Sequence, residues 1–556
     1  MTFWENLFRL LLRRPMPALA ALYWHLTRRK VRARNRVRVA SADLDYPYAM
    51  WIRKHERNDE RVDEFQAAIE SWARKPRIAV LLHSSGSPTQ SELERSTASV
   101  ESQLFRASDV ADASGGSLEQ SLRGIDADFV VPLRIGNLLS ETALFRFAEA
   151  IQANPESKIF FGDHDHLDAL GRRGRPWFKP RWNREMFLAQ DYLSDAVAIE
   201  TEVARKAAPR VNSLGALLLA ATARVGEDIV HVPHILCHVT AAPDAAERRL
   251  EAVRQHVQPL GGSCTEGLYG TVKVQWPLPD ALPLVSIVIP TRDKLELLRT
   301  CMEGILERTS YANFEVLIVD NESVERRTKA FLTEIVEDPR VRVIGFAGEF
   351  RFGAMNNHAA QHARGDFLCL LNNDTEILDP EWLTELMRYA IRPDIGAVGA
   401  KLLYEDGSIQ HAGVIVGIGG AAGHAHRFLP ADDPGYFRQA HVTQFVSAVT
   451  AACLVVEKLK FLAVGGLDET DLPVAFNDVD FCLKLQKAGW RNVYVPHAVL
   501  VHHESKSRGN DTSRRNIDRF RREEHVLQQR WGTQNFSDPL LNPNLDPATE
   551  TFVIRL

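Results

Sequence analysis

The chain has 556 residues, of which 45% are hydrophobic and 25% are charged, and its formal net charge is −5. At roughly 150 residues per domain this length allows two to four domains, and the composition excludes a disordered or fibrous protein. The charge is uneven, because residues 1–40 carry ten Lys or Arg against Glu5 alone.

Residues 1–75 form a segment that begins basic and has a helical pattern. Arg9, Arg13, Arg14 and Pro15 interrupt its apolar residues, so no run reaches the roughly 20 residues of a spanning helix. No cleavage site typical of a signal peptide follows them. Residues 1–40 could instead contact an anionic membrane surface from the side. A solvated basic helix or tail is an equal alternative.

The cysteines predict a reducing compartment. The chain has 6 of them, widely separated and without a CxxC pair, mostly among apolar neighbours. This spacing does not suit a disulfide framework or a zinc site. We therefore expect buried thiols and a cytoplasmic protein.

Two long stretches alternate short apolar strands with helical patterns. The first begins near Arg77, and the second follows the proline-rich linker WPLPDALPL at residues 276–284. Such alternation predicts an α/β fold with mainly parallel sheets covered by helices on both faces. We expect domains at residues 76–275 and 276–556.

The two stretches resemble each other, which predicts an internal repeat. ADFVVPLRIGNLLS at residues 127–140 aligns with GDFLCLLNNDTEIL at residues 365–378, and VNSLGALLL aligns with FNDVDFCLK. Polar positions of the second copy are changed in the first: Asn372 to Arg134, Asp374 to Gly136, Asp478 to Ser213 and Asp480 to Gly215. The fold alone therefore does not require these residues, and the second copy is expected to carry the chemistry.

Three acids stand at or just after the ends of apolar strands in the second copy: Asp293, Asp320 and Asp374. In an open parallel sheet, ligands bind outside the carboxyl ends of the strands. Carboxylates there could bind a base or ribose, or hold a divalent cation against phosphate oxygens. The alternatives are local: Asp293 and Asp320 could cap helices, and Asp374 could be a turn residue.

The ordered segments SIVIPTRD, VLIVDNES, GDFLCLLNND, FNDVDFCLKLQKAGW and VHHESKSRG resemble the inverting family 2 glycosyltransferases of the GT-A fold. The resemblance covers residues 284–543, and the first copy resembles the degenerate N-terminal copy of some large members. It implies two tandem GT-A-like domains, of which the second is catalytic. It also implies transfer of a sugar from a nucleotide-diphosphate donor to a glycan or glycolipid hydroxyl in bacterial surface polysaccharide or lipopolysaccharide assembly.

The resemblance also assigns roles to individual residues. The donor nucleotide would be bound by Pro290, Thr291, Asp293, Asp320, Asn372 and Arg508. Asp374 and His502 would hold Mn²⁺ or Mg²⁺, with Asn372 where the family has an acid. Asp478 would be the catalytic base, and Asp480, His503 and Ser507 would support the site, His503 as the substitute for His502.

Other interpretations stay open. His502 taken alone could be a satisfied buried histidine, and both copies could form a non-catalytic glycan-binding or scaffolding protein. A nucleotidyltransferase is disfavoured because no glycine-rich basic loop opens either copy. GDHDHLD at residues 162–168 is expected to be a surface turn, with adventitious metal binding as its alternative. No basic and aromatic pattern indicates nucleic acid.

Overall fold

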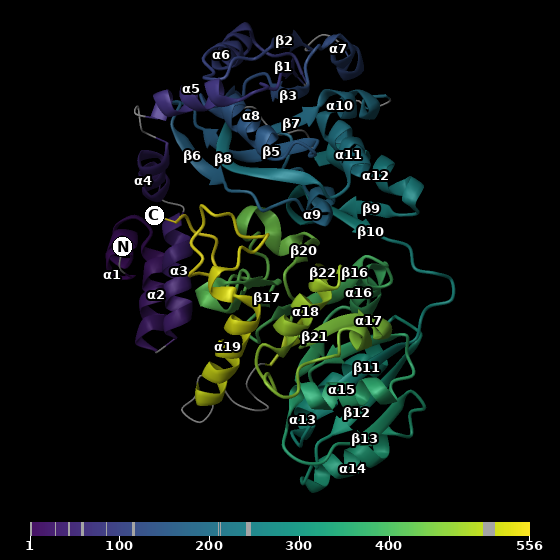
Figure 1. Ribbon diagram of the computed structural model, residues 1–556. Helices are drawn as coiled ribbons and strands as arrows, with labels where there is room; N and C mark the ends of the chain where they lie inside the picture. Colours follow the sequence, from purple (N-terminus) through teal and green to yellow (C-terminus); the bar gives the residue numbers. More distant parts are fainter. Residues whose placement is uncertain are drawn as a thin grey trace. The chain divides into compact units, whose positions relative to one another are not determined.

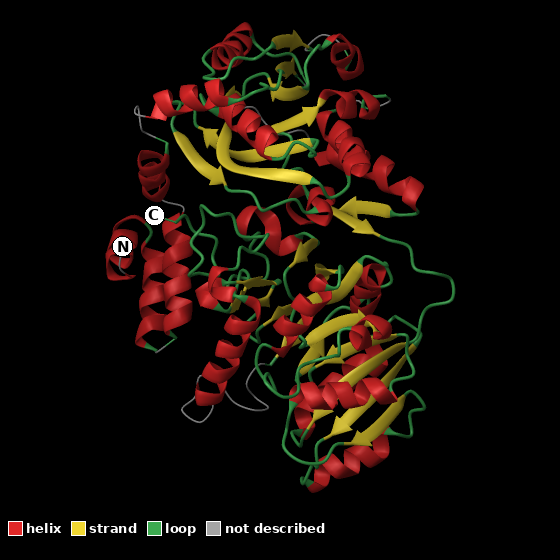
Figure 2. Ribbon diagram, in the orientation of Figure 1, coloured by secondary structure: helices red, strands yellow, loops and turns green. Residues whose placement is uncertain are grey.

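A computed structural model describes residues 3–27, 29–42, 45–56, 61–84, 86–113, 117–209, 211, 213–240, 246–503 and 517–555. The chain divides into two compact units (Figures 1 and 2). Unit 1 comprises Met1–Val274, Pro539–Asp546 and Phe552–Leu556, and unit 2 comprises Gln275–Asp538 and Pro547–Thr551. The end of the chain thus contributes to both.

Unit 1 begins with five helices: α1 (Phe3–Arg13), α2 (Pro15–Leu26), α3 (Lys30–Ala42), α4 (Asp45–His55) and α5 (Arg61–Ser71). The first three share a small apolar core of Leu7, Leu10, Ala18, Ala21, Val37 and Ala40. Within the described part of the chain, no helix is long and apolar enough to cross a membrane.

The sheet of unit 1 has the strand order β2-β1-β3-β7-β5-β8-β4, and β6 pairs with β5. Its strands are β1 (Ile78–His83), β2 (Asp109–Asp112), β3 (Phe129–Arg134), β4 (Leu138–Leu139), β5 (Ile159–Leu167), β6 (Arg173–Trp177), β7 (Val197–Glu200) and β8 (Ile229–Val239); β9 (Ser263–Glu266) and β10 (Val272–Gln275) form a separate pair. Its helices are α6 (Gln90–Glu101), α7 (Leu118–Gly124), α8 (Ala143–Ala153), α9 (Arg184–Ala189), α10 (Thr201–Ala207), α11 (Leu214–Val225) and α12 (Ala246–Val257).

The sheet of unit 2 has the strand order β13-β12-β11-β14-β21-β16-β22-β15, with β17 beside β16 and β20 beside β22. Its strands are β11 (Val285–Thr291), β12 (Phe314–Asp320), β13 (Val341–Gly345), β14 (Phe367–Leu371), β15 (Thr375–Ile377), β16 (Ile395–Leu403), β17 (Ile409–His411), β20 (Gln444–Val446), β21 (Cys453–Glu457) and β22 (Arg491–His502); β18 (Val414–Val416) and β19 (Ala422–His424) pair separately. Its helices are α13 (Leu295–Glu303), α14 (Arg326–Ile335), α15 (Phe352–His362), α16 (Trp382–Ala390), α17 (Lys458–Ala463), α18 (Asn477–Lys487) and α19 (Ile517–Trp531).

The two sheets have the same topology. The order β2-β1-β3-β7-β5-β8-β4 corresponds step by step to β12-β11-β14-β21-β16-β22-β15. Each step is also parallel or antiparallel in the same way, and β6 on β5 corresponds to β17 on β16. The predicted α/β fold is confirmed; each sheet is mixed, with β7 and β21 running against their neighbours.

Unit 2 buries its central strands because they are apolar on both faces. Every residue of β11 is buried. Val285, Ile287 and Ile289 pack in one core cluster with α13, α14 and α16, and α15 covers the other face of β11 and β12 (Figure 1). Gly365 lets β14 approach β11, since a Cβ there would lie 2.6 Å from the carbonyl oxygen of Leu284.

Candidate active site at the strand ends of unit 2

The predicted donor residues lie along one edge of the sheet in unit 2. Thr291, the last residue of β11, is in register with Asp320, the last residue of β12. On the other side of β11, β14 runs parallel to it and ends just before Asn372. Asn373 ties these ends together by donating from Nδ2 to Thr291 Oγ1 at 2.9 Å. The structure therefore brings these strand ends together, as expected of a parallel sheet.

Asp293 caps α14. Its Oδ1 accepts hydrogen bonds from the backbone N–H groups of Val324 and Glu325, each at 2.8 Å. Asp293 itself has φ 55° and the next residue, Lys294, has φ 62°. Two consecutive residues of this kind in the left-handed region mark a strained turn, and such turns gather at ligand sites. The contacts of Asp293 are therefore with the loop before α14 rather than with the first turn of α13, the helix that follows it, and its turn suits ligand binding.

Asp320 makes a similar local contact. Its Oδ1 accepts from the backbone N–H of Ser323 at 3.1 Å, and the Ser323 hydroxyl accepts from the N–H of Asp293 at 2.9 Å. Ser323 therefore links the two acids at the strand ends. This contact holds the Asp320 carboxylate at the end of β12.

Asn372, Asp374 and His502 meet at one point, although His502 is distant in sequence. His502 Nε2 lies 3.1 Å from Asp374 Oδ1 and 3.0 Å from Asn372 Nδ2. The antiparallel pairing of β15 with β22 sets this contact, because Thr375 is in register with His502. Asp374 and His502 are both buried. The structure therefore assembles the three residues that the sequence grouped around a cation.

Gln410 sets the ring tautomer of His502. Its Nε2 donates to the His502 carbonyl at 3.4 Å, so its Oε1 is the atom that lies 2.7 Å from His502 Nδ1. An amide oxygen only accepts, hence Nδ1 carries a proton. In neutral imidazole Nε2 then presents a lone pair toward the Asp374 carboxylate. Nε2 also accepts a hydrogen bond from Asn372 Nδ2 at 3.0 Å, and a cation between Nε2 and the carboxylate would relieve the close approach of these two acceptors.

The same three residues fit a divalent cation. Carboxylate oxygen and imidazole nitrogen are metal ligands, and turning the amide of Asn372 would add its carbonyl oxygen. Among the described residues no cluster of three or more His, Cys, Asp or Glu could hold a metal. Here the third position is an amide, which leaves the site with one carboxylate and less negative charge.

Asp478 lies near this group, in the first turn of α18. Its Oδ2 accepts from the backbone N–H of Ala451 at 3.2 Å, and the next carbonyl, of Ala452, accepts from the N–H of Asn372 at 3.1 Å. Burial raises the pKa of Asp478, and the N–H of Ala451 opposes that shift. A carboxylate with a raised pKa is a stronger proton acceptor, which suits a general base.

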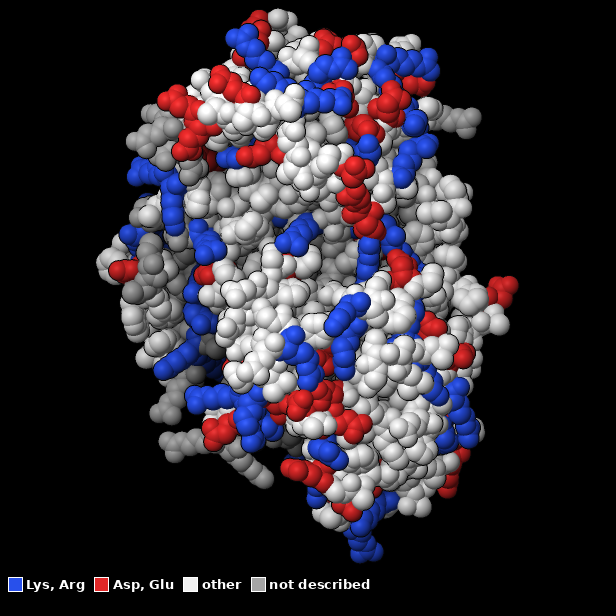
Figure 3. Space-filling model, in the orientation of Figure 1, with Lys and Arg blue, Asp and Glu red and all other residues white. Residues whose placement is uncertain are grey.

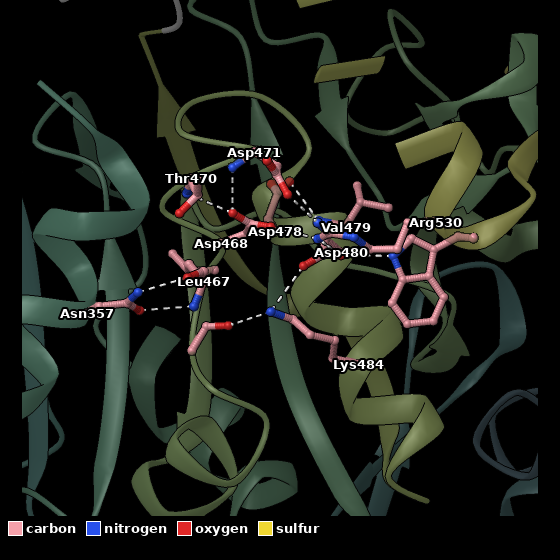
Figure 4. Close-up of polar contacts among 12 residues, drawn as sticks. Asn357, Leu467, Asp468, Thr470, Asp471, Asp478, Val479, Asp480, Lys484 and Arg530 are labelled. Atoms are coloured by element: carbon pink, nitrogen blue, oxygen red, sulfur yellow. Dashed lines mark hydrogen bonds and ion pairs between the residues drawn. The ribbon is translucent and has the colours of Figure 1, made fainter. Parts of the chain in front are cut away.

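Asp480 has different partners from Asp478 (Figure 4). It is fully buried and accepts from Arg530 Nη1 and Trp531 Nε1, each at 2.9 Å. Lys484 Nζ lies 3.1 Å from its other oxygen. Asp480 therefore fastens α19 to α18.

His503 is placed elsewhere. Its Nδ1 contacts Glu405, and its Nε2 lies 3.5 Å from Glu376 Oε2. Only its backbone N–H reaches the cation group, where it donates to the carbonyl of Asp374 at 2.9 Å. Ser507 and Arg508 lie outside the described residues.

The expected surface turn at residues 162–168 is wrong. This segment falls largely within β5, where Asp163, His164 and Asp165 are buried. Buried carboxylates need partners, and both have them. Asp163 Oδ1 lies 2.8 Å from His231 Nε2, and Asp165 Oδ2 accepts from Arg173 Nε at 2.5 Å.

The partners of these acids explain the error. The Asp163 carboxylate also accepts from Asn542 Nδ2 at 2.9 Å, and that of Asp165 accepts from the Tyr48 hydroxyl at 2.5 Å. Both partners are more than a hundred residues away in sequence. Local polarity predicted exposure, whereas distant side chains satisfy the charges inside unit 1.

Sequence reasoning also missed Gln410 and the backbone of Ala451. Gln410 follows no motif, and its role depends on the pairing of β16 with both β17 and β22. Ala451 contributes only an N–H group, for which a side-chain pattern carries no signal. Asn373 lies in the segment GDFLCLLNNDTEIL, and its polar side chain directly after an apolar strand was the signal that could have identified it.

The chain is similar in sequence to several known proteins. Residues 286–416 match the family model described as glycosyl transferase family 2. A protein of Sinorhizobium fredii described as uncharacterized protein y4gI is 40% identical over 448 residues, covering 77% of this chain and 49% of that protein. The O-antigen biosynthesis protein RfbC of Myxococcus xanthus is 34% identical over 461 residues, covering 80% of this chain and 35% of that protein.

A shorter relative aligns along most of its own length. The N-acetylglucosaminyl-diphospho-decaprenol L-rhamnosyltransferase of Mycobacterium tuberculosis is 28% identical over 255 residues, covering 42% of this chain and 80% of that protein. The chain spans about half or less of the length of the first two relatives. Residues 286–416, which contain the three strand ends and the cation group up to Asp374, are thus the part of the chain that matches glycosyl transferase family 2.

Proposed function

We propose that the protein is a metal-dependent, inverting glycosyltransferase that moves a sugar from a nucleotide-diphosphate donor to a hydroxyl of a glycan or glycolipid. The observation that carries the proposal is the contact of His502 Nε2 with Asp374 Oδ1 at 3.1 Å. This pair lies beside Asn372, whose backbone is linked through Ala452 and Ala451 to the Asp478 carboxylate. A cation position and a base therefore adjoin the strand ends where a nucleotide would bind.

In this mechanism Asp478 accepts the proton of the acceptor hydroxyl. The hydroxyl oxygen forms a bond to the anomeric carbon while the bond from that carbon to the diphosphate oxygen breaks. The nucleoside diphosphate leaves with the electron pair, and attack from the opposite face inverts the anomeric centre. One displacement suffices, so no side chain needs to bond covalently to the sugar.

The donor is positioned by the strand ends. Pro290, Thr291, Asp293 and Asp320 would lie against the base and ribose, with Arg508 near the diphosphate. A divalent cation, Mn²⁺ or Mg²⁺, held by Asp374, His502 and the amide oxygen of Asn372 would supply positive charge to the departing diphosphate. Gln410 supports this role, because it fixes the His502 tautomer that leaves Nε2 available.

The relatives suggest the biological class. One is named for O-antigen biosynthesis, and another for rhamnosyl transfer to a diphospho-decaprenol-linked sugar. We therefore assign this chain to bacterial surface polysaccharide or lipopolysaccharide assembly, with a glycan or lipid-linked glycan acceptor. We place it in the cytoplasm, with residues 1–40 in peripheral contact with the inner face of the membrane.

Unit 1 is assigned as a non-catalytic copy of the same fold. Its sheet repeats the strand order of unit 2. Arg134 ends its β3, and Gly136 stands where unit 2 has Asp374. A guanidinium and a glycine offer no metal ligand at these positions, so donor binding is expected in unit 2 alone.

The test is thermal unfolding of the full chain with a panel of nucleoside diphosphates, with and without Mn²⁺ or Mg²⁺. A ligand that binds only the native state raises the melting temperature. We expect one nucleotide to stabilise the protein, more so with metal, and Asp374→Ala to lose the metal-dependent part. Asp280→Ala in the exposed linker is the matched control.

Asp478→Asn separates binding from chemistry. It should keep the nucleotide-induced stabilisation and lose acceptor-dependent release of nucleoside diphosphate. Normal turnover by Asp478→Asn would overturn the assignment of the base. No response of the wild-type protein to any nucleotide would favour the alternative, a glycan-binding or scaffolding protein without catalysis, for which the Asn372 amide is the supporting observation.

A further inference from the structure

The second helix of the chain presents its large apolar side chains outward. In α2, Ala18 and Ala21 are buried against the neighbouring helices. Met16, Leu19, Tyr23 and Leu26 are 76%, 52%, 62% and 72% exposed. Their spacing of i, i+3, i+7 and i+10 places them on one helix face. A helix of a globular protein ordinarily buries such a stripe, so α2 is inverted in this respect.

The first helix also exposes an apolar stripe. Leu7 and Leu10 of α1 are buried in the small core of the three helices. Trp4, Phe8, Leu11 and Leu12 are exposed, and their positions i, i+4, i+7 and i+8 again form one stripe. The apolar arc of α1 is therefore wider than the part that packs against α2 and α3. We call the exposed side chains of both helices the α1–α2 face: Trp4, Phe8, Leu11, Leu12, Met16, Leu19, Tyr23 and Leu26.

The charge around the α1–α2 face is positive. Within described residues 3–27 and 29–42 the only acid is Glu5. Exposed basic side chains stand on α1, between the helices and at the start of α3: Arg9, Arg13, Arg14, Arg29 and Lys30. Figure 3 shows blue Lys and Arg atoms next to white surface at the left of the view, where Figure 1 places α1–α3. The face is thus apolar with a basic surround.

We propose that the α1–α2 face docks on an anionic lipid bilayer. Large contiguous apolar surfaces on soluble domains mark interaction sites. A bilayer interface takes up aromatic and aliphatic side chains to a depth of about 5–10 Å, while Lys and Arg remain at the level of the headgroups. The apolar side chains of the α1–α2 face therefore suit the bilayer interior, and its basic surround suits anionic headgroups. A second copy of this chain fits less well, because a symmetric contact would bring like charges together.

This inference refines the peripheral contact included in the proposed function. Docking through α1 and α2 would hold the chain beside a lipid-linked acceptor, which diffuses in the plane of the membrane. Vesicle binding is measured without donor or acceptor, so its failure would leave the assignment of glycosyl transfer untouched. Conversely, loss of nucleotide binding would leave the docking surface untouched.

The test is co-sedimentation of the full chain with phosphatidylcholine vesicles that contain or lack phosphatidylglycerol. The wild-type protein should bind the anionic vesicles. The variant Phe8→Gln/Leu12→Gln/Leu19→Gln should partition at least tenfold less, because burial of each large apolar side chain contributes about tenfold or more. These positions are exposed, so the variant should fold, which its melting temperature checks.

Two further variants make the outcome specific. Leu170→Gln/Leu459→Gln removes apolar side chains that are 77% and 71% exposed elsewhere, and it should bind as the wild-type protein does. Arg13→Gln/Arg14→Gln should weaken binding to anionic vesicles and not to neutral ones. Absence of wild-type binding to the anionic vesicles, or equal binding by the triple variant, would overturn the proposal. So would a dimer in solution that the triple variant converts to a monomer without any vesicle binding by the wild type.

Discussion

Replacing Asp480 by alanine removes the carboxylate through which α18 holds α19. Asp480 is fully buried, and Arg530, Trp531 and Lys484 converge on it at 2.9, 2.9 and 3.1 Å (Figure 4). The two cations differ from a deeply buried pair, because the Arg530 and Lys484 side chains are 32% and 25% exposed. Water can therefore reach both after the substitution.

The expected loss of stability depends on which hydrogen-bond acceptors each donor keeps after the substitution. Arg530 retains Asp468 at 2.7 Å and Asp471 at 3.1 Å, and Lys484 Nζ still donates to the carbonyl of Gly466 at 2.9 Å. The indole N–H of Trp531 loses its acceptor. Breaking a buried ion pair costs about 3–5 kcal/mol, and solvent screening of partly exposed cations lowers that figure. We expect Asp480→Ala to lower the free energy of unfolding by about 2–3 kcal/mol.

Urea denaturation measures this loss, and native-state hydrogen exchange locates it in α18 and α19. The matched control is Asp471→Ala, which removes a carboxylate that also contacts Arg530 but is 55% exposed. Such a surface pair contributes about 0–1 kcal/mol. Equal, small losses of stability in both variants would refute the view that Asp480 anchors α19.

Two further predictions concern the reaction site. Burial raises the pKa of Asp478, so its charged form destabilises the folded protein at pH values above the pKa that it has when unfolded. Near neutral pH, Asp478→Asn should therefore have a higher free energy of unfolding than the wild type, by about 1.4 kcal/mol for each unit by which burial raises the pKa. This gain should vanish at acid pH, where Asp478 is protonated in both the folded and the unfolded state. A wild-type protein as stable as the variant at neutral pH would contradict it. Gln410→Ala should weaken Mn²⁺ binding in the presence of nucleotide by about 10–100-fold in calorimetry, because it removes the partner that orients His502. The control Glu405→Gln, which alters a partner of His503, should leave the Mn²⁺ affinity unchanged. An unaltered affinity in Gln410→Ala would refute the assigned tautomer.

Much of the architecture could be predicted because its signals are local. FLCLL is an uninterrupted apolar run, and LVSIVIPT is apolar except for Ser286 and Thr291; they form β14 and β11 with every strand residue buried. FNDVDFCLKL has helical spacing, and α18 covers it from Asn477. The prediction for residues 162–168 was wrong because it too used local signals: the polar residues indicate a solvated turn, whereas side chains far along the chain donate hydrogen bonds to the acids.

The sequence alone determined the family, the alternation of strand and helix, and the order of the acids at the strand ends, because each depends on residues close together in the chain. Only the tertiary structure decided which acid has which partner. The β15–β22 pairing brings His502 to Asp374, and Gln410 then fixes its tautomer. In the same way, Asp478 and Asp480 stand two positions apart on α18, yet one contacts the Ala451 backbone and the other the end of α19. Strand register and helix packing join residues separated by long stretches of chain, and local periodicity predicts neither of them.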